Sequence, residues 1–239
     1  MATKRVAAPK RAQPAKRRLP RGAPGRAAIV VERLKEAYPS AHTELTWNDP
    51  FQLLVAVILS AQTTDVQVNT VMPALVARYP DAASLAGAAQ EDVEQLVKPT
   101  GFFHVKAQSI REMAQDVLRL HDGTVPDTME ELVQLHGVGR KTANVVLGVA
   151  FGKPGFAVDT HVTRLTQRLR LTSSSDPVKI EADVTSIVPS AEWTGLSLRL
   201  ILHGRRVCSA RKPRCEACVL NDICPCAFFW LKAKKPSGC

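Results

Sequence analysis

The sequence contains no hydrophobic run long enough to cross a membrane. Its longest central apolar stretch, Leu53 to Leu59, has seven residues, whereas a membrane-spanning helix requires about 20. Alternating polar and apolar residues, the pattern of a half-buried strand, are scarce, and there is no internal repeat. A chain of 239 residues that is 45% hydrophobic can bury one substantial core, or two smaller lobes that share a cleft. We expect a soluble, globular protein without a membrane partner.

Acidic residues are absent from the first 26 positions, which carry nine basic side chains. The remaining positions hold 23 basic and 22 acidic residues, so the net charge of +10 lies mostly in this segment. Such a charge density, interrupted by four prolines, predicts a disordered basic arm over residues 1–26. A phosphate backbone is its natural partner, although a targeting signal or a solvated tail has the same composition.

Cysteine is infrequent, and four of the six cysteines fall within 17 residues. They are separated by six, two and five residues, at Cys208, Cys215, Cys218 and Cys224. Four thiolates suit either an iron-sulfur cluster or zinc. Zinc sites usually contain two tight Cys-x2-Cys pairs, and only one is present here, so we favour the cluster. Cys226 and Cys239 fall outside this spacing and are expected to be free thiols.

Helical periodicity dominates the chain. Apolar residues recur three and four positions apart over residues 29–37, 66–76, 105–120, 158–169 and 193–202. Short loops separate these segments. The sequence therefore predicts an all-α fold of about ten helices.

Capping signals agree with this interpretation. Thr128, followed by Glu131 three positions later, has the capping-box pattern. Asp65, Asp159 and Asp176 stand where helix N-caps are expected. We predict helix starts at these four positions.

Residues 135–143, with the sequence LHGVGRKTA, connect two of the expected helices. Gly137 and Gly139 permit the positive backbone angles that a tight turn between helices requires. Because neither has a side chain, their amides and the following helix N-terminus can approach a phosphate oxygen closely. Any glycine turn between helices looks similar, so this hairpin indicates DNA binding only in combination with other features.

Lys141 falls in the first turn of the second hairpin helix. The positive end of the helix dipole disfavours an ammonium there, and a neutral amine can form a Schiff base with a sugar that is losing its base. Eighteen positions later, the Asp159 carboxylate is placed to stabilise an oxocarbenium-like sugar and to assist deprotonation of the lysine. The plain alternatives are a solubilising surface lysine and a simple helix cap.

Together these features resemble the endonuclease III family. The resemblance rests on LSAQTTDVQVN at 59–69, LHGVGRKTANVV at 135–146, VDTH at 158–161 and the cysteine spacing. The family comprises bifunctional DNA glycosylases of base excision repair that contain a helix-hairpin-helix motif and a 4Fe-4S cluster. The resemblance implies that oxidised pyrimidines are excised from duplex DNA and that the strand is then cleaved by β-elimination through a Lys141 Schiff base.

The resemblance also implies an all-α architecture of two helical lobes that flank a DNA-binding cleft. A six-helix barrel lobe with the helix-hairpin-helix is expected over residues 43–153. Residues 27–42 and 154–226 are expected to form the iron-sulfur cluster lobe. A C-terminal tail is expected over residues 227–239.

By matching position, Lys141 is the Schiff-base nucleophile, Asp159 is its carboxylate partner, and the four cysteines ligate the 4Fe-4S cluster. Gln62 is expected to fill the space left by an extruded nucleotide. The full set of expected DNA contacts is Gln62, Phe102, His104, Gly137, Val138, Gly139 and Lys212.

The sequence departs from the family pattern in two places. His136 stands where the family usually has a proline, so we expect a less rigid turn that keeps both glycine amides. Phe102 and His104 stand in place of the usual leucine wedge and its neighbouring asparagine. A bulkier wedge can still push between base steps, but the lesion preference of the family is not carried over.

Two other functions compete with this interpretation. A monofunctional adenine-mismatch glycosylase of the same superfamily would lack Lys141 and usually adds a C-terminal recognition domain. A non-catalytic DNA-binding protein would be expected to lack Lys141 or Asp159, and both are present.

We expect a monomer in the cytoplasm, associated with the nucleoid if bacterial, whose partner is double-stranded DNA with damaged bases or abasic sites. The cluster's purpose stays open between structure, positioning of the basic loop 211–214 and electron exchange.

Overall fold

The computed structural model describes residues 22–229, and this part of the chain contains helices, turns and loops but no strand. The predicted all-α class is therefore confirmed. No helix in this range is both long and apolar enough to span a lipid bilayer. The elements of this range are α1 (Gly22–Ala37), α2 (Pro50–Leu59), α3 (Asp65–Arg78), α4 (Ala82–Ala86), α5 (Gln90–Val97), η1 (Lys98–Thr100), α6 (Phe103–His121), α7 (Met129–Leu132), α8 (Arg140–Ala150), α9 (Thr160–Arg168), α10 (Pro177–Thr185), η2 (Ser190–Glu192), α11 (Trp193–Arg206) and η3 (Cys215–Ala217).

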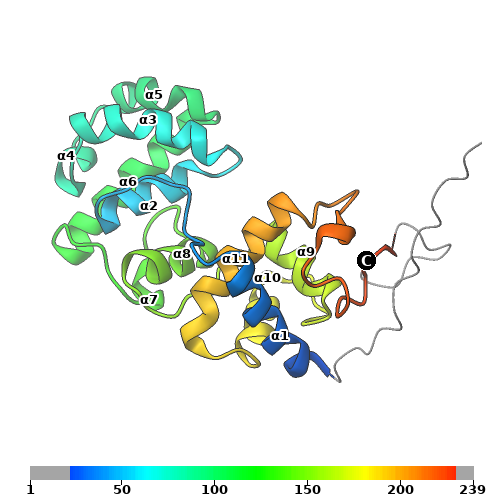
Figure 1. The fold of residues 1–239 in the computed structure, drawn as a ribbon. Coiled ribbons are helices and arrows are strands. Elements are labelled where there is room, and N and C mark those ends of the chain that lie inside the picture. Colours follow the sequence, from blue (N-terminus) through cyan, green and yellow to red (C-terminus); the bar gives the residue numbers. More distant parts are fainter. Residues whose placement is uncertain (1–21, 230–239) are drawn as a thin grey trace, which may run out of the picture.

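Two hydrophobic cores divide these helices into two groups. The first core gathers buried residues of α2 to α8, from Leu45 to Leu147. The second core is built from α1, α9, α10 and α11, together with Leu220 and Ile223. Figure 1 shows the two groups as lobes, with α8 and α11 close to their junction. Helix α1 belongs to the lobe of the C-terminal half because its buried face joins the second core.

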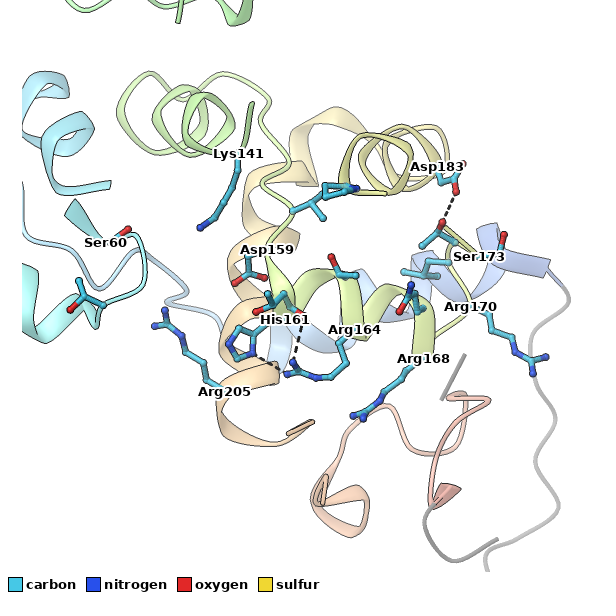
Figure 2. A pocket seen from close by; sticks show the side chains of 18 residues that line it. Ser60, Lys141, Asp159, His161, Arg164, Arg168, Arg170, Ser173, Asp183 and Arg205 are labelled. Carbon is cyan, nitrogen blue, oxygen red and sulfur yellow. Dashed lines mark hydrogen bonds between the residues drawn. The ribbon is translucent and has the colours of Figure 1, made fainter. Parts of the chain in front are cut away.

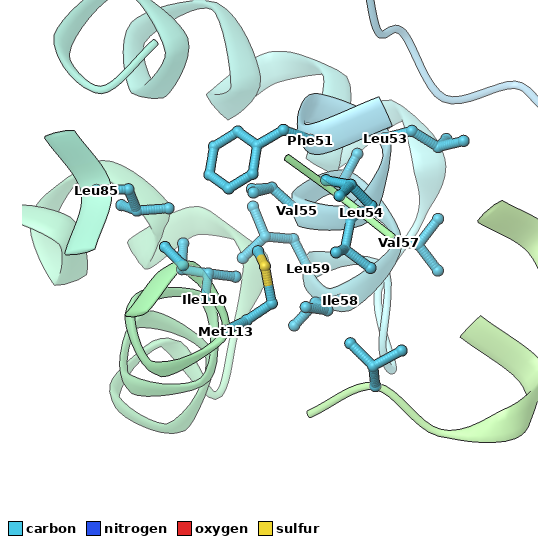
Figure 3. Close-up of a cluster of buried hydrophobic side chains, with 14 of the residues drawn as sticks. Phe51, Leu53, Leu54, Val55, Val57, Ile58, Leu59, Leu85, Ile110 and Met113 are labelled. Atoms are coloured by element: carbon cyan, nitrogen blue, oxygen red, sulfur yellow. The ribbon is translucent and has the colours of Figure 1, made fainter. Parts of the chain in front are cut away.

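Helix α2 is the centre of the first core. Every residue from Phe51 to Leu59 is buried, and Figure 3 shows their side chains pointing to several sides of the helix, with Leu85, Ile110 and Met113 packed nearby. A helix that is surrounded by other helices has no polar face. The helical periodicity used above therefore misses this segment.

The linker between α8 and α9, residues 151–159, is attached to helices on both sides. The buried side chain of Asn144 in α8 accepts a linker amide N–H at 3.1 Å. The hydroxyl of Thr194 in α11 exchanges two hydrogen bonds with the backbone of Gly155, at 3.1 and 3.3 Å. The buried hydroxyl of Ser197 donates to another linker carbonyl at 2.7 Å. The linker thus has a fixed path between the lobes.

Three of the four predicted helix starts are confirmed, because Thr128, Asp159 and Asp176 are the N-caps of α7, α9 and α10. The prediction for Asp65 is wrong, since Thr64 caps α3 and Asp65 lies in its first turn. A threonine hydroxyl is itself an effective cap, and it leaves the aspartate free to form an ion pair between the lobes, described below.

The predicted end of the basic arm, at residue 26, is also wrong. Helix α1 already begins at Gly22, and the Arg26 guanidinium donates to the carbonyls of Leu169 and Arg170. Pro24 is tolerated because the amides of a first helical turn have no partner within the helix. The rest of the predicted arm lies outside the described residues.

The described part of the expected C-terminal tail, residues 227–229, is buried or half-buried. Phe229 is buried, and the Arg168 guanidinium lies 4.9 Å from its ring centroid, within cation–π range. Cys226 is buried and disulfide-bonded, so the expectation of a free thiol is wrong for this residue. The rest of the tail, Cys239 included, lies outside the described residues.

A methyl group at Gly155 tests the fixed path of the linker. The added Cβ would lie 2.3 Å from the backbone oxygen of Asn144, an atom that cannot rotate away. We expect Gly155→Ala to lower the free energy of unfolding by about 1–3 kcal/mol, measured by urea denaturation followed by circular dichroism. Gly87→Ala is the control, because its Cβ would meet its nearest neighbour at 3.7 Å. Equal stabilities of the two variants would contradict this packing.

Candidate functional site

A cleft of about 1560 Å³ opens beside the junction of the lobes. Its lining comes from the turn between α2 and α3, the start of α8, the linker and helices α9 to α11. Figure 2 shows the side chains that face it. The charged residues of the lining are Lys141, Arg164, Arg168, Arg170 and Arg205, against Asp159 and Asp183. This excess of cations suits a polyanionic ligand.

Lys141 projects into the cleft from the first turn of α8. Its side chain is exposed, and within residues 22–229 its amine donates no hydrogen bond and forms no ion pair. In Figure 2 the side chain extends from α8 toward the loop that carries Asp159. The amine is therefore available to a molecule bound in the cleft.

Asp159 lies where the linker meets α9. One carboxylate oxygen, Oδ1, accepts the N–H of Val162 at 2.8 Å and so caps the helix, which leaves the other oxygen for further partners. On the same helix, Arg164 Nη2 lies 3.0 Å from Nδ1 of His161. Because arginine only donates, Nδ1 accepts, and Nε2 of a neutral ring carries the proton. Burial is the main cause that lowers the pKa of His161.

Glu181 of α10 holds the first turn of α8 in place. Arg140 donates to both of its carboxylate oxygens, at 2.8 and 2.7 Å, in the bidentate geometry that fixes orientation. The side chain of Asn144 donates to the same carboxylate at 3.0 Å. Arg140 directly precedes Lys141, and Asn144 also binds the linker. One carboxylate therefore connects the lysine-bearing turn with the segment that leads to Asp159.

The hairpin glycines differ from each other in conformation. Gly137 has a φ of 71°, as expected for a tight turn. Gly139 has a φ of −84° and a ψ of 170° as the N-cap of α8, so the expectation of a positive angle is wrong there. Its missing side chain leaves open space instead, because an added Cβ would meet nothing within 4 Å. Helix α8 also has no side-chain cap, so its first amides remain suited to an anion.

His136 is tied to α6 by two contacts. Its N–H donates to Asp116 at 2.9 Å, a bond that proline cannot form, and its Nε2 lies 2.7 Å from a carboxylate oxygen of Glu112. These contacts attach the turn to α6, and the expectation of a less rigid turn did not take them into account. The side chain of Val138 is buried and its N–H donates to the Leu135 carbonyl, so this residue shapes the turn.

Gln62, Phe102 and His104 lie outside the residues that line the cleft. Gln62 is exposed in the turn between α2 and α3, with a φ of 54°. Phe102 is 66% exposed, and both it and the preceding Gly101 have positive φ values, of 47° and 69°. A strained backbone thus presents an aromatic ring to solvent, which is a mark of functional segments. His104 is paired with Glu94 at 2.8 Å.

The four candidate cluster cysteines lie beside α9, α11 and the C-terminal segment. Three of their sulfur atoms accept N–H donors: Cys208 from Arg168 at 3.2 Å, Cys218 from Leu220 at 3.4 Å, and Cys215 from Phe228 at 3.5 Å. Nε2 of His203 also lies 3.2 Å from the sulfur of Cys218. Hydrogen bonds of this kind surround sulfur ligands of metal centres.

The cysteine group fits a cluster better than a single ion. Within residues 22–229, no three His, Cys, Asp or Glu side chains are grouped closely enough to hold one metal ion. The four cysteines nevertheless interact electrostatically. Burial is the main cause that raises the pKa of Cys218 to about 12, and Cys208, Cys224 and Cys215 raise this pKa as well. Such thiols keep their protons until a metal displaces them. Four thiols that interact in this way suit an iron-sulfur cluster.

Helix α9 connects this cysteine centre with the cleft. Arg168 donates to two loop carbonyls just after Cys208, at 2.8 and 2.7 Å, and Arg164 donates to the Cys208 carbonyl. Both arginines also line the cleft. Lys212 is exposed in the loop that they hold.

Sequence reasoning missed an ion-pair group between the lobes. Arg205 of α11 lines the cleft and pairs with Asp65 at 2.9 Å and with Glu44 at 2.5 Å. Glu181 was missed as well. The partners of Arg205 are 140 and 161 positions away, so no local pattern marks them. Ser60 and Thr63, within the recognised LSAQTTDVQVN segment, also line the cleft.

Comparison with known proteins agrees with this arrangement. Residues 55–190 match the model of the HhH-GPD superfamily of base excision DNA repair proteins. Residues 208–224 match the iron-sulfur binding domain of endonuclease III. The fold and the site thus define a base excision repair protein with a helix-hairpin-helix and an iron-sulfur centre.

Individual relatives narrow this class. Endonuclease III of Synechocystis sp. is 50% identical over 203 residues, 84% of this chain and 93% of the relative. Endonuclease III of Escherichia coli K12 is 40% identical over 195 residues, 82% of this chain and 92% of the relative. The structure of a trapped endonuclease III–DNA covalent intermediate has a TM-score of 0.80 at 37% identity, and the match covers 84% of this chain and 95% of that chain.

The chain belongs to the endonuclease III family. It is a DNA glycosylase and abasic-site lyase of base excision repair, acts on DNA and contains a 4Fe-4S cluster. The family, enzyme class and cofactor expected from the sequence motifs are therefore confirmed. The structure of a thermostable thymine-DNA glycosylase, 22% identical with a TM-score of 0.76 over 84% of this chain and 95% of that chain, shares the fold.

Glu181→Gln tests how the lysine-bearing turn is positioned. The amide loses the charge that holds Arg140, and the Glu181 side chain is only 13% exposed. We expect a loss of about 1–2 kcal/mol in the free energy of unfolding and a larger effect on turnover of abasic-site DNA than on its binding. Asp127→Asn is the control, since this exposed carboxylate pairs with Lys153 and should be nearly neutral. Full turnover by Glu181→Gln would show that the carboxylate does not position the lysine.

Proposed function

We propose that Lys141 is the nucleophile with which this enzyme attacks damaged DNA. The amine forms a bond to the sugar carbon while the bond to the base breaks, and the base leaves with that electron pair. Opening of the sugar ring then gives a Schiff base. Loss of a proton from the neighbouring sugar carbon expels the 3′ phosphate, which is β-elimination. The observation that carries this proposal is the Lys141 amine, which has no hydrogen-bond or ion-pair partner within residues 22–229 and projects into a cationic cleft toward Asp159.

Asp159 is the carboxylate partner of this lysine in our proposal. Its negative charge stabilises the positive charge that develops on the sugar as the base departs. It also assists the deprotonation of the Lys141 ammonium, so that a neutral amine attacks. Support comes from its place in the same cleft as Lys141 and from the carboxylate oxygen that the helix cap leaves unused. A related endonuclease III has been trapped as a covalent intermediate with DNA, which is consistent with this chemistry.

The substrate that we propose is duplex DNA containing oxidised pyrimidines or abasic sites. The turn from Gly137 to Gly139, Val138 included, and the following helix start hold phosphate, and the exposed Lys212 adds a second phosphate contact. Phe102 and the neighbouring His104 enter the base stack where a nucleotide is extruded, and Gln62 fills the space it leaves.

The two lobes divide these tasks in our proposal. Residues 43–153 form the barrel lobe with the lysine, and residues 27–42 with 154–226 form the cluster lobe with the aspartate. The two separate hydrophobic cores support this division. The cluster supplies no bond-breaking step, and its ligands hold the loop of Lys212. We further propose that the enzyme acts as a monomer in the cytoplasm, where it associates with the nucleoid if the cell is bacterial.

Borohydride trapping tests the role of Lys141. Reduction of a Schiff base links enzyme and DNA permanently, so adding borohydride during reaction with an oxidised-pyrimidine duplex should give a covalent adduct on a denaturing gel. Lys141→Ala should give no adduct, whereas Lys153→Ala, which removes another exposed lysine near α8, should give the normal amount. Undiminished trapping by Lys141→Ala would overturn the assignment. A panel of damaged bases in the same assay defines the substrate range.

Asp159→Asn separates catalysis from helix capping. Asparagine caps a helix about as well as aspartate, so the variant should fold and bind abasic-site DNA normally. Because it lacks the charge and the proton acceptor, we expect single-turnover rates to fall by about 10²–10⁴-fold. Binding is measured by fluorescence anisotropy and turnover by strand cleavage. A normal rate would reduce Asp159 to a helix cap.

A further inference from the structure

His203 is a buried histidine that the proposed reaction does not use. It lies in the last turn of α11 and is 2% exposed. Its ring atom Nε2 lies 3.2 Å from the sulfur of Cys218, and its Nδ1 lies 3.0 Å from the hydroxyl of Tyr38. Its backbone carbonyl accepts the N–H of Cys208 at 2.8 Å. One residue therefore contacts two of the four cluster ligands, and it does not line the cleft.

Tyr38 reaches this histidine from 165 positions earlier in the sequence. It follows α1 directly, its N–H donates to the Leu34 carbonyl at 2.9 Å, and its own carbonyl accepts from Arg199 at 3.4 Å. The rings of Tyr38 and His203 meet edge-on, with centroids 5.8 Å apart and planes at 77°. The phenol is therefore placed by the backbone at the end of α1 and by its contact with α11.

The cluster determines the direction of both hydrogen bonds. A cysteine that binds iron is a thiolate with no proton to donate, so Nε2 of His203 must donate to the sulfur of Cys218. A neutral imidazole has only one ring proton, so Nδ1 must accept, and the Tyr38 hydroxyl must donate to it. Burial of the ring disfavours a charged imidazolium. The tyrosine hydroxyl thus stabilises the tautomer that the thiolate requires, in which the Nε2–H is directed at the cluster ligand.

We propose that Tyr38 and His203 form a hydrogen-bond relay that sets the electron affinity of the 4Fe-4S cluster. Hydrogen bonds to cluster sulfurs stabilise the more electron-rich state and raise the reduction potential. The Cys218 sulfur also accepts the backbone N–H of Leu220 at 3.4 Å, a bond that side-chain substitutions at Tyr38 and His203 leave in place. The relay is made of neutral groups, so it adjusts the potential without adding a charge beside the cluster.

Tyr38→Phe is the smallest change that interrupts this relay, because it removes only the hydroxyl. Holoenzyme variants with verified iron content are compared by protein-film voltammetry in the absence of DNA. Tyr38→Phe should shift the reduction potential to more negative values. His203→Leu should shift it further, because the N–H donor itself is lost. Tyr79→Phe is the matched control, since Tyr79 is the only other tyrosine and its hydroxyl lies 3.5 Å from Asp92 in the other lobe. Its potential should equal that of the unmodified enzyme.

The double variant distinguishes a relay from two independent effects. Once His203 is leucine, the Tyr38 hydroxyl has no imidazole to orient, so adding Tyr38→Phe should cause no further shift. An unchanged potential in Tyr38→Phe overturns the relay, and so does an equal shift with and without His203. If His203→Leu fails to retain iron, His203→Gln, which keeps an N–H donor, replaces it in the cycle. In the His203→Gln background, Tyr38→Phe should then shift the reduction potential less than it does in the unmodified enzyme. Borohydride trapping through Lys141 is expected in all these variants, so this test is separate from that of the reaction.

Discussion

The attachment of the linker between the two lobes is the constraint on which the rest of the site depends. Lys141 is anchored in α8 and Asp159 begins α9, so their relative position is set by how the linker is held. Asn144 is central, because its side chain accepts a linker amide and donates to Glu181, while its backbone oxygen leaves no room for a side chain at Gly155. A buried polar group that forms hydrogen bonds through both of its polar atoms is held in a defined arrangement. The side chain of Asn144, together with those of Thr194 and Ser197, therefore fixes the path of the linker between the two lobes.

The positive potential of the cleft comes from the placement of charges, because beyond the first 26 residues the chain is nearly neutral, with 23 basic and 22 acidic residues. Arg205 is balanced by two carboxylates and ties the lobes together. Arg164 and Arg168 are different, since they donate mainly to backbone carbonyls and to a cysteine sulfur. Their hydrogen bonds are satisfied while their charge is not cancelled by a carboxylate. The same two side chains therefore stand between the cluster cysteines on one side and the cation-rich cleft on the other.

Features that depend on neighbours in the sequence could be predicted. The cap at Asp159, the positive φ at Gly137 and the spacing of the four cysteines are all local properties, and each was found from the residues alone. Helix α2 was missed because it is buried on all sides and so lacks the polar face that produces a helical period. The prediction of a positive φ at Gly139 was wrong because two glycines in one turn do not show which of them adopts the positive φ. The other glycine can be there only because its missing side chain leaves space for a bound group. The start of α1 was misplaced because the prediction of a disordered arm rested on charge density and proline content. The few residues that α1 buries near its start give too weak a helical pattern to change that prediction.

The residues that sequence reasoning left out lie far in the sequence from the residues they contact. Glu181 lies 41 positions from Arg140, Arg205 lies 140 positions from Asp65, and His203 lies 165 positions from Tyr38. Each pair joins elements that are distant in the chain, so no periodicity or spacing encodes it. Each also acts on a group that a motif identifies: the lysine-bearing turn, the edge of the cleft and a cluster cysteine. The motifs therefore specify which chemical groups are present, whereas these long-range pairs set the position, charge balance and hydrogen-bonding state in which those groups work.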